Sequence, residues 1–154
     1  MRTITVALGE KTYNIEIAAG LLDQIGAKAR VLSQAVKAAI ISDSNVDPLY
    51  GERLERSLAA SGFEVTRIVF AAGEQSKNLT VLGQVYDELA RAGLTRSDLI
   101  LTLGGGVPGD LGGFAAATFL RGIDFIQVPT SLLAQIDSSG KVFNKSGSIN
   151  TAFG

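Results

Sequence analysis

LILTLGGGVPGDLGGF, residues 99–114, is the stretch that decides the fold, because an apolar run leads there into a glycine-rich turn. The mostly apolar segment 98–103 is typical of a strand that is covered on both faces. A helix is expected over residues 109–122, with Pro108 placed where a first-turn proline fits. A buried strand, a tight turn and a helix in this order form one unit of a parallel α/β sheet.

The same alternation of helices and strands extends from this stretch toward both ends of the chain. Helices are expected over 20–33, 48–62 and, with Asn78 as the N-cap, 78–93; strands are expected over 36–46, 64–70 and 124–129. Connections of a few residues join them. The predicted fold class is therefore α/β, a Rossmann-like doubly wound domain with a mainly parallel sheet and an N-terminal antiparallel β-hairpin.

The hairpin is predicted from the alternation of apolar and polar residues over the segment 3–17. A two-residue loop at Gly9 and Glu10 would set Val6 opposite Tyr13 and Ile4 opposite Ile15. The apolar faces of the two strands then coincide.

Length and composition allow one domain and exclude several kinds of chemistry. The chain has 154 residues, of which 46% are hydrophobic, a net charge of −1, no cysteine and no histidine. Residues 1–139 are predicted to form the domain, and residues 140–154, which lack periodicity, a divergent or truncated tail. The charge gives no reason to expect nucleic acid or a membrane as partner. Without thiolate or imidazole ligands, any metal or acid–base chemistry must use carboxylates, lysines, tyrosines or a separate chain, and no metal site is expected in this chain. A cytoplasmic location is the default, because no segment has the length and apolarity of a membrane span or signal peptide.

Polar residues gather where the predicted strands end, and ligands of open α/β sheets bind at that edge. The four ends read SDSN (42–45), AGEQSK (72–77), GGGVPGD (104–110) and PTSLLAQIDSS (129–139). We expect them to line one crevice. Gly104, Gly106 and Gly109 have the spacing GxGxxG, which suits a diphosphate at the start of a helix, although a plain glycine turn with close helix packing explains the same residues.

The polar side chains at these ends each have a structural and a functional interpretation. Glu74 either binds the two hydroxyls of a ribose or is a solvated loop acid, and Lys77 either contacts an anion or is merely exposed. Asp43 and Asn45 either cap a turn or bind a nucleotide. Asp137 suits an Asx-type turn with the serines that follow it.

Read together, SDSNV, GEQSK and GGGVPGDLGGFAAATFLRGIDFIQVPTSLLAQIDSS resemble the 3-dehydroquinate synthase family of sugar-phosphate cyclases, as far as about residue 139. The resemblance implies the NAD-binding half of an enzyme that converts 3-deoxy-arabino-heptulosonate 7-phosphate to 3-dehydroquinate and phosphate in the shikimate pathway. It implies a transient oxidation by NAD, elimination of phosphate, re-reduction and an aldol closure, a lyase reaction with no net redox change.

The resemblance also implies roles for individual residues. Most of the cofactor contacts lie at the strand ends: Asp43, Asn45, Glu74, Lys77, Gly104, Gly105, Gly106, Val107, Gly109, Asp110, Thr130, Ser131, Leu133 and Asp137. Asp137 and Lys141 resemble residues near the substrate, and Arg121 resembles an arginine that reaches the substrate phosphate of the neighbouring subunit, which implies a homodimer. The sequence departs from the family at Pro108, usually aliphatic, at Ser131, usually threonine, and in the segment 137–141, which is shorter.

In the family a C-terminal helical domain supplies histidines for zinc, and the 154 residues contain no such domain and no histidine. We therefore expect a chain that binds NAD, lacks zinc and is not catalytically competent alone. Two alternatives remain open from the sequence. One is an isolated, trimmed or redesigned folding or assembly scaffold without a ligand, and the other is an NAD-dependent enzyme like glycerol dehydrogenase.

Overall fold

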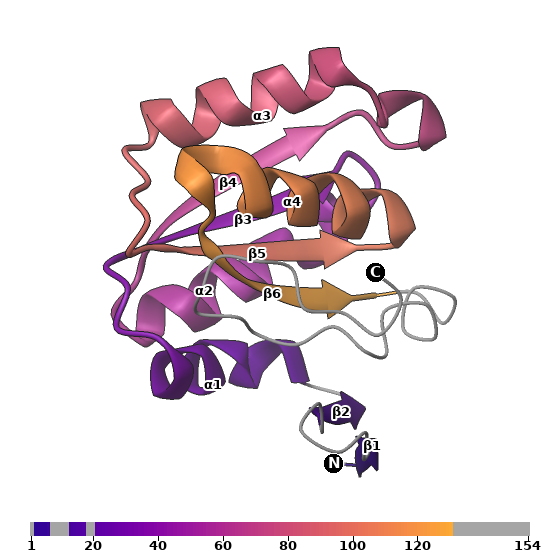
Figure 1. Cartoon of the computed structure of the whole chain (residues 1–154). Coiled ribbons are helices and arrows are strands. Elements are labelled where there is room, and N and C mark those ends of the chain that lie inside the picture. Colours follow the sequence, from indigo (N-terminus) through magenta and orange to yellow (C-terminus); the bar gives the residue numbers. More distant parts are fainter. Residues whose placement is uncertain (1, 7–12, 18–20, 131–154) are drawn as a thin grey trace.

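A four-stranded parallel sheet forms the centre of the molecule, in the strand order β4-β3-β5-β6. The computed structural model describes residues 2–6, 13–17 and 21–130 (Figure 1). The strands of this sheet are β3 (Lys37–Asp43), β4 (Glu64–Phe70), β5 (Leu99–Gly104) and β6 (Asp124–Pro129). The predicted α/β class is confirmed, and the sheet is more regular than expected, since all its strands are parallel rather than most of them.

The two strands before the first helix form a sheet of their own and do not join the parallel sheet. β1 (Arg2–Val6) pairs antiparallel with β2 (Tyr13–Ile17), and the register places Val6 opposite Tyr13 and Ile4 opposite Ile15. The turn predicted at Gly9 and Glu10 lies outside the described residues.

Helices cover both faces of the parallel sheet. On one face lie α1 (Ile25–Leu32), preceded by the short turn η2 (Leu21–Gln24), and α2 (Glu52–Ala60), preceded by the π-helical turn η3 (Asp47–Gly51). On the other face lie α3 (Leu79–Arg91), preceded by η4 (Glu74–Ser76), and α4 (Gly106–Thr118), followed by η5 (Phe119–Arg121) (Figure 1). Within the described part of the chain, no helix combines the length and the apolarity that crossing a bilayer requires.

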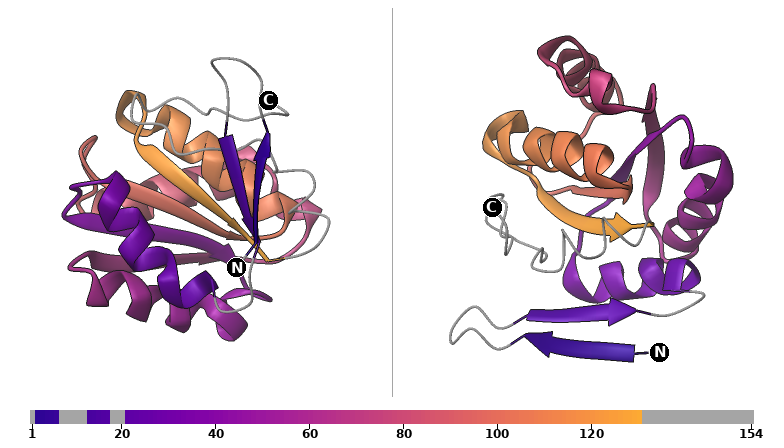
Figure 2. Two further views of the ribbon diagram at one scale, coloured as in Figure 1. Left: turned by 90° about the horizontal axis from the view of Figure 1, so that it is seen from below. Right: turned by 90° about the vertical axis from the view of Figure 1, so that its right-hand side faces the viewer.

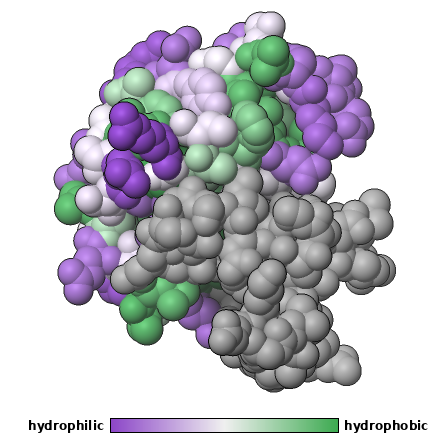
Figure 3. All heavy atoms as spheres, viewed as in Figure 1, coloured by the Kyte–Doolittle hydropathy of each residue, from purple (hydrophilic) through white to green (hydrophobic). Residues whose placement is uncertain are grey.

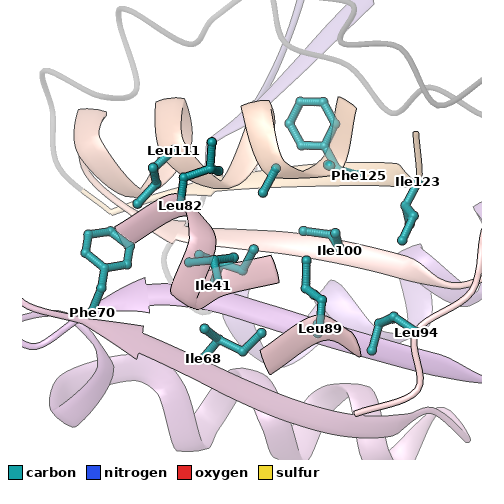
Figure 4. Packing of buried hydrophobic residues seen from close by; sticks show 14 residues of the cluster. Ile41, Ile68, Phe70, Leu82, Leu89, Leu94, Ile100, Leu111, Ile123 and Phe125 are labelled. Atoms are coloured by element: carbon teal, nitrogen blue, oxygen red, sulfur yellow. The ribbon is translucent and has the colours of Figure 1, made fainter. Parts of the chain in front are cut away.

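Strand β3 shows how the sequence builds two cores from one sheet. Because side chains alternate along a strand, Ala39 and Ile41 face α3 and α4, whereas Ala38 and Ile40 face α1 and α2. All four are fully buried, which explains why the strand reads as a continuous apolar run. Figure 4 shows the first of these cores, in which aliphatic residues of α3 and α4 pack against the sheet around Ile41 and Ile100.

Helix α4 begins earlier than predicted, at Gly106 instead of residue 109, and ends at Thr118 instead of residue 122. Glycine is a poor helix former, so the sequence pattern assigned these glycines to the preceding turn. Tertiary packing compensates, because a Cβ built on Gly112 would lie 2.5 Å from Cγ2 of Thr102 on β5. The helix therefore rests on the sheet at a distance that only glycine allows.

The strand order creates a switch point between β3 and β5. From β3 the chain moves outward through α2 to β4, and it then returns over the other face, through α3, to β5 on the opposite side of β3. We call the edge at which the parallel strands end the carboxyl edge, and the edge at which they begin the amino edge. The carboxyl edge faces the viewer in the right-hand panel of Figure 2. Doubly wound proteins bind their ligands at the switch point of this edge.

Candidate functional site

The glycine turn between β5 and α4 lies at the switch point. Gly105 is the N-cap of α4, and Gly109 donates its N–H to the Gly105 carbonyl over 3.3 Å. The first N–H groups of a helix have no acceptor within the helix, and Pro108 has no N–H at all. The remaining first-turn donors, the N–H groups of Gly106 and Val107, have no acceptor among the described residues. Two backbone donors at the positive end of a helix suit an anionic group.

The space beside this turn is open. Gly106 is exposed, and a Cβ built on it would meet no heavy atom of the described residues within 4 Å. Gly104, just before the turn, has a φ of +140°, and a Cβ there would lie 2.8 Å from Cγ of Pro108. Gly104 is thus required by the fold, whereas the fold places no such demand on Gly106.

The loop that follows β3 is held by Asp43. Its Oδ1 accepts the N–H groups of Asn45 and Val46, each over 2.9 Å, and the side chain is buried. Asp43 therefore caps the turn, one of the two interpretations left open from the sequence, while Asn45 is exposed at the tip of the loop. Val46 lies next to the glycine turn, since its Cγ2 is 3.5 Å from a Cβ built on Gly104.

Ser44, which the sequence interpretation passed over, joins the loop after β3 to the loop after β4. Its N–H donates to the Phe70 carbonyl and its Oγ accepts the N–H of Ala72, both over 2.9 Å. The second loop then passes through Gly73, whose φ of +115° favours glycine, to the exposed Glu74. The sequence did hold a signal for this connection, because Ser44 carries a hydroxyl and directly follows Asp43, the last residue of β3.

Lys77 and Asp110 form an ion pair that links the loop after β4 to helix α4. Lys77 Nζ lies 2.9 Å from Asp110 Oδ2, and the side chains are 44% and 40% exposed. The hydrogen bond to Asp110 raises the pKa of Lys77, and the charges of Asp110 and Glu74 act in the same direction. Figure 3 shows hydrophilic surface at its upper right, over η4 and the start of α3.

The ends of β5 and β6 are also joined, because the N–H of Thr130 donates to the Gly104 carbonyl over 3.1 Å. The structure thus places the predicted residues from Asp43 to Thr130 at the carboxyl edge, with one exception described next. Four further predicted residues lie outside the described part of the chain: Ser131, Leu133, Asp137 and Lys141.

Arg121 is the exception, because it lies at the amino edge. Helix α4 runs from the end of β5 to the start of β6, so its last turn is about 20 Å from the glycine turn. Leu120 and Arg121 have φ values of +50° and +67°, and Arg121 is exposed with no ion pair to any described residue. Consecutive non-glycine residues in the left-handed region are rare, and neither the pattern nor the composition pointed to them.

The described residues do not fit a metal ion. They contain no group of three or more His, Cys, Asp or Glu side chains arranged to hold one, and the 154-residue sequence has no histidine or cysteine. Zinc sites use these ligand types.

Comparison with known proteins places this geometry in a family. Residues 67–153 match the family described as 3-dehydroquinate synthase N-terminal. The chain is 53% identical over 144 residues to the 3-dehydroquinate synthase of Clostridium acetobutylicum, covering 92% of this chain and 40% of the relative. It therefore spans about two fifths of the length of that relative.

Solved structures of related synthases also superpose on this chain. The 2-deoxy-scyllo-inosose synthase solved with carbaglucose-6-phosphate, NAD+ and Co2+ superposes with a TM-score of 0.75 at 25% identity, over 86% of this chain and 36% of that one. The 2-epi-5-epi-valiolone synthase of Streptomyces hygroscopicus, with NAD+ and Zn2+ bound, superposes with a TM-score of 0.63 at 32% identity, over 82% and 35%. Both relatives thus bind NAD+ and a metal ion.

Proposed function

This chain belongs to the 3-dehydroquinate synthase family, and from that premise we propose that it is the NAD-binding half of such an enzyme. The observation that carries the proposal is the glycine turn at the switch point, where the N–H groups of Gly106 and Val107 have no acceptor among the residues that the structure describes. The reaction proposed for the complete enzyme is the conversion of 3-deoxy-arabino-heptulosonate 7-phosphate to 3-dehydroquinate and phosphate.

The position of these residues at the carboxyl edge supports a site for NAD. The diphosphate would take the N–H groups at the start of α4, and the carboxylate of Glu74 is suited to ribose hydroxyls, as acids after a Rossmann strand are. Gly104, Gly109 and Thr130 shape the turn, while Asp43 and Asn45 form the neighbouring wall. When bound, NAD supplies a hydride acceptor that returns the hydride later in the reaction. The chain's own task in this proposal is to bind and orient it.

Zinc and most of the substrate contacts are proposed to come from parts of the enzyme other than these 154 residues, because the ligands that zinc requires are not among them. This chain is then inactive by itself and acts as the nucleotide-binding module. Thr130, Ser131, Leu133 and Asp137 are proposed to contact the cofactor, and Asp137 and Lys141 the substrate.

Arg121 is proposed to bind the substrate phosphate of a second copy of the chain. Two facts support this role: Arg121 lies at the edge opposite its own glycine turn, and its backbone is held in a conformation that costs about 1 to 2 kcal/mol per residue. Strain of this kind persists where it serves a site. The proposal implies a homodimer, which sedimentation equilibrium of the chain and of an Arg121→Ala variant would test.

Calorimetric titration of NAD into the chain tests the cofactor site. We expect saturable binding, weakened at least tenfold by Gly106→Val, whose side chain would occupy the space beside the unclaimed N–H groups, and weakened severalfold by Glu74→Ala. Gly83 offers a matched control, because it also lies in a helix and a Cβ built on it meets no heavy atom within 4 Å in the described part of the chain. Gly83→Val should leave NAD affinity unchanged.

Two outcomes would contradict the proposal. A folded chain that binds no NAD would leave a folding or assembly scaffold as the better description. Equal losses in Gly106→Val and Gly83→Val would show that the glycine turn is not the binding element. The glycerol dehydrogenase alternative is less well supported, because identity to a 3-dehydroquinate synthase reaches 53% over 92% of the chain.

A further inference from the structure

We infer that Thr102 and Gln127 hold one buried water molecule beneath helix α4, in a binding site that the proposed function does not use. Thr102 is 1% exposed, and its hydroxyl oxygen Oγ1 is buried without a hydrogen-bond partner among the described residues. The side-chain oxygen Oε1 of Gln127 is likewise buried and has no partner in the described part of the chain.

The sheet places these two side chains next to each other. Thr102 on β5 and Gln127 on β6 are paired in the parallel register, so their side chains point to the same face. That face is the one that α4 covers, because Cγ2 of Thr102 lies 2.5 Å from a Cβ built on Gly112. The residue paired with Thr102 on its other side, Ile41 of β3, is apolar. Of its two neighbours across the sheet, Gln127 is thus the one that offers Thr102 a polar group.

The helix above them cannot supply the missing hydrogen bonds. The buried residues of α4 bring no polar side chain to the layer between helix and sheet, since they are glycine, alanine, leucine and proline: Pro108, Gly109, Leu111, Gly112, Gly113, Ala115 and Ala116. The peptide groups in the middle of a helix are already bonded to one another. The partner of Thr102 and Gln127 therefore has to be a molecule other than the helix, and the enclosure of Thr102 limits it to a small one.

A single water molecule satisfies both side chains. Thr102 and Gln127 make no direct hydrogen bond to each other, and polar groups that do not reach each other are commonly bridged by water. The water accepts the hydroxyl hydrogen of Thr102 and donates one of its own hydrogens to Oε1 of Gln127. A buried water typically makes two to four hydrogen bonds, and these are two of them. Buried polar atoms nearly always have a partner, and the bridge gives one to each of this pair.

The effect of Thr102→Val on stability tests the inference by its sign. Valine has nearly the shape of threonine but no hydroxyl, so it removes one hydrogen bond to the water. We expect the equilibrium constant for folding, measured with urea, to fall about tenfold. A hydroxyl without any partner destabilises the folded state, and its removal would instead raise the constant. A variant at least as stable as wild type therefore overturns the inference.

Thr66→Val is the matched control, because it makes the same change on the same face of the sheet. Thr66 lies on the edge strand β4, is paired with Ala39 and is partly exposed. It should change the folding constant by no more than about twofold. Equal losses in Thr66→Val and Thr102→Val would show that the loss is general to strand threonines, and would overturn the inference.

A double-mutant cycle with Gln127→Leu tests whether the two side chains act through one molecule. We expect the double variant to lose less than the sum of the two single losses, because removing both partners leaves no polar group without a bond. Additive losses count against a shared water.

A high-resolution crystal structure of the chain locates the water directly. We expect its oxygen about 2.7 to 3.2 Å from both Thr102 Oγ1 and Gln127 Oε1. A direct hydrogen bond between the two side chains, or another side chain bonded to either of them, overturns the inference. None of these experiments involves NAD, so their outcome does not depend on the proposed function.

Discussion

The two edges of the parallel sheet are built in different ways. At the amino edge, Asp98 is only 5% exposed and ties the start of β3 to the turn before β5, whereas at the carboxyl edge the ion pair of Lys77 and Asp110 has side chains that are 44% and 40% exposed. Buried, fully used polar groups stabilise a fold, while exposed ones contribute little to stability and stay accessible to a ligand. The buried carboxylate at the amino edge therefore stabilises the sheet, whereas the exposed ion pair at the carboxyl edge stays accessible to a ligand.

The largest effect is expected from Asp98→Ala. The Asp98 carboxylate accepts the N–H of Lys37 over 2.9 Å, the N–H of Thr95 over 2.8 Å and the Thr95 hydroxyl over 3.0 Å. Because hydrogen bonds to a buried charged group contribute more than neutral ones, we expect a loss of about 3 kcal/mol in the free energy of unfolding, measured with urea. Asp98→Asn, which keeps one acceptor oxygen, should lose less. If NAD affinity falls in the molecules that remain folded, the division of roles between the edges is wrong.

Arg30→Met is expected to cost about 2 kcal/mol, because Arg30 joins three segments at the amino edge. Its guanidinium lies 3.7 Å from the centre of the Phe63 ring and donates to the carbonyls of Ser61, Ser33 and Ala35. Methionine keeps the apolar stem but none of these contacts. Comparing the thermal unfolding of Arg30→Met with that of Arg30→Lys separates the contribution of the planar guanidinium from that of the positive charge. If Arg30→Lys is as stable as wild type, this account is contradicted.

Asn78→Ala probes a residue of the carboxyl edge that does contribute to stability. As the N-cap of α3, Asn78 accepts the N–H of Val81 over 2.9 Å, and losing such a cap costs about 1 kcal/mol. Asn78→Asp keeps the acceptor and should retain most of the stability measured in urea. A loss as large as that of Asp98→Ala would remove the contrast between the edges.

Much of the fold was predictable because its signals are local. The strands 64–70 and 124–129 were predicted with the bounds that β4 and β6 have, and the N-cap at Asn78 is confirmed. The start of α4 was predicted wrongly, because local propensity counts glycine against a helix, while the close approach of Gly112 to Thr102 is a tertiary effect.

For the candidate site, too, the sequence predicted which strand ends meet but not how the loops between them fold. Parallel strands bring their ends to one edge, so Asp43, Gly104 and Thr130 were expected to be neighbours without any knowledge of loop shape. The pairing of Lys77 with Asp110 was not predictable, since it depends on how the loop after β4 folds over α4. The left-handed backbone conformation of Leu120 and Arg121 could not be predicted from the sequence either, because such positions usually carry glycine or asparagine.

The smallest effect concerns the pH dependence of the ion pair at the carboxyl edge. The pKa of Lys77 is raised by its hydrogen bond to Asp110, so the folded state holds this proton more tightly than the unfolded chain, whose lysine has the ordinary value of 10.5. The stabilisation is fully present below that pH and is lost as the pH rises through the higher pKa of the folded state.

We therefore expect the stability difference between wild type and Lys77→Met to be level well below pH 10.5 and to be lost as the pH rises through the higher pKa of the folded state. Its amplitude should be about a few tenths of a kcal/mol, because solvent screens an exposed pair. Urea titrations of both proteins across this range measure the difference directly, since other groups titrate equally in the two and cancel. The loss caused by Asn78→Ala involves neutral groups only, so it should stay level over the same window. A Lys77→Met difference that also stays level would mean that the ion pair stabilises neither edge, and that the contribution of Lys77 lies entirely in binding the ligand.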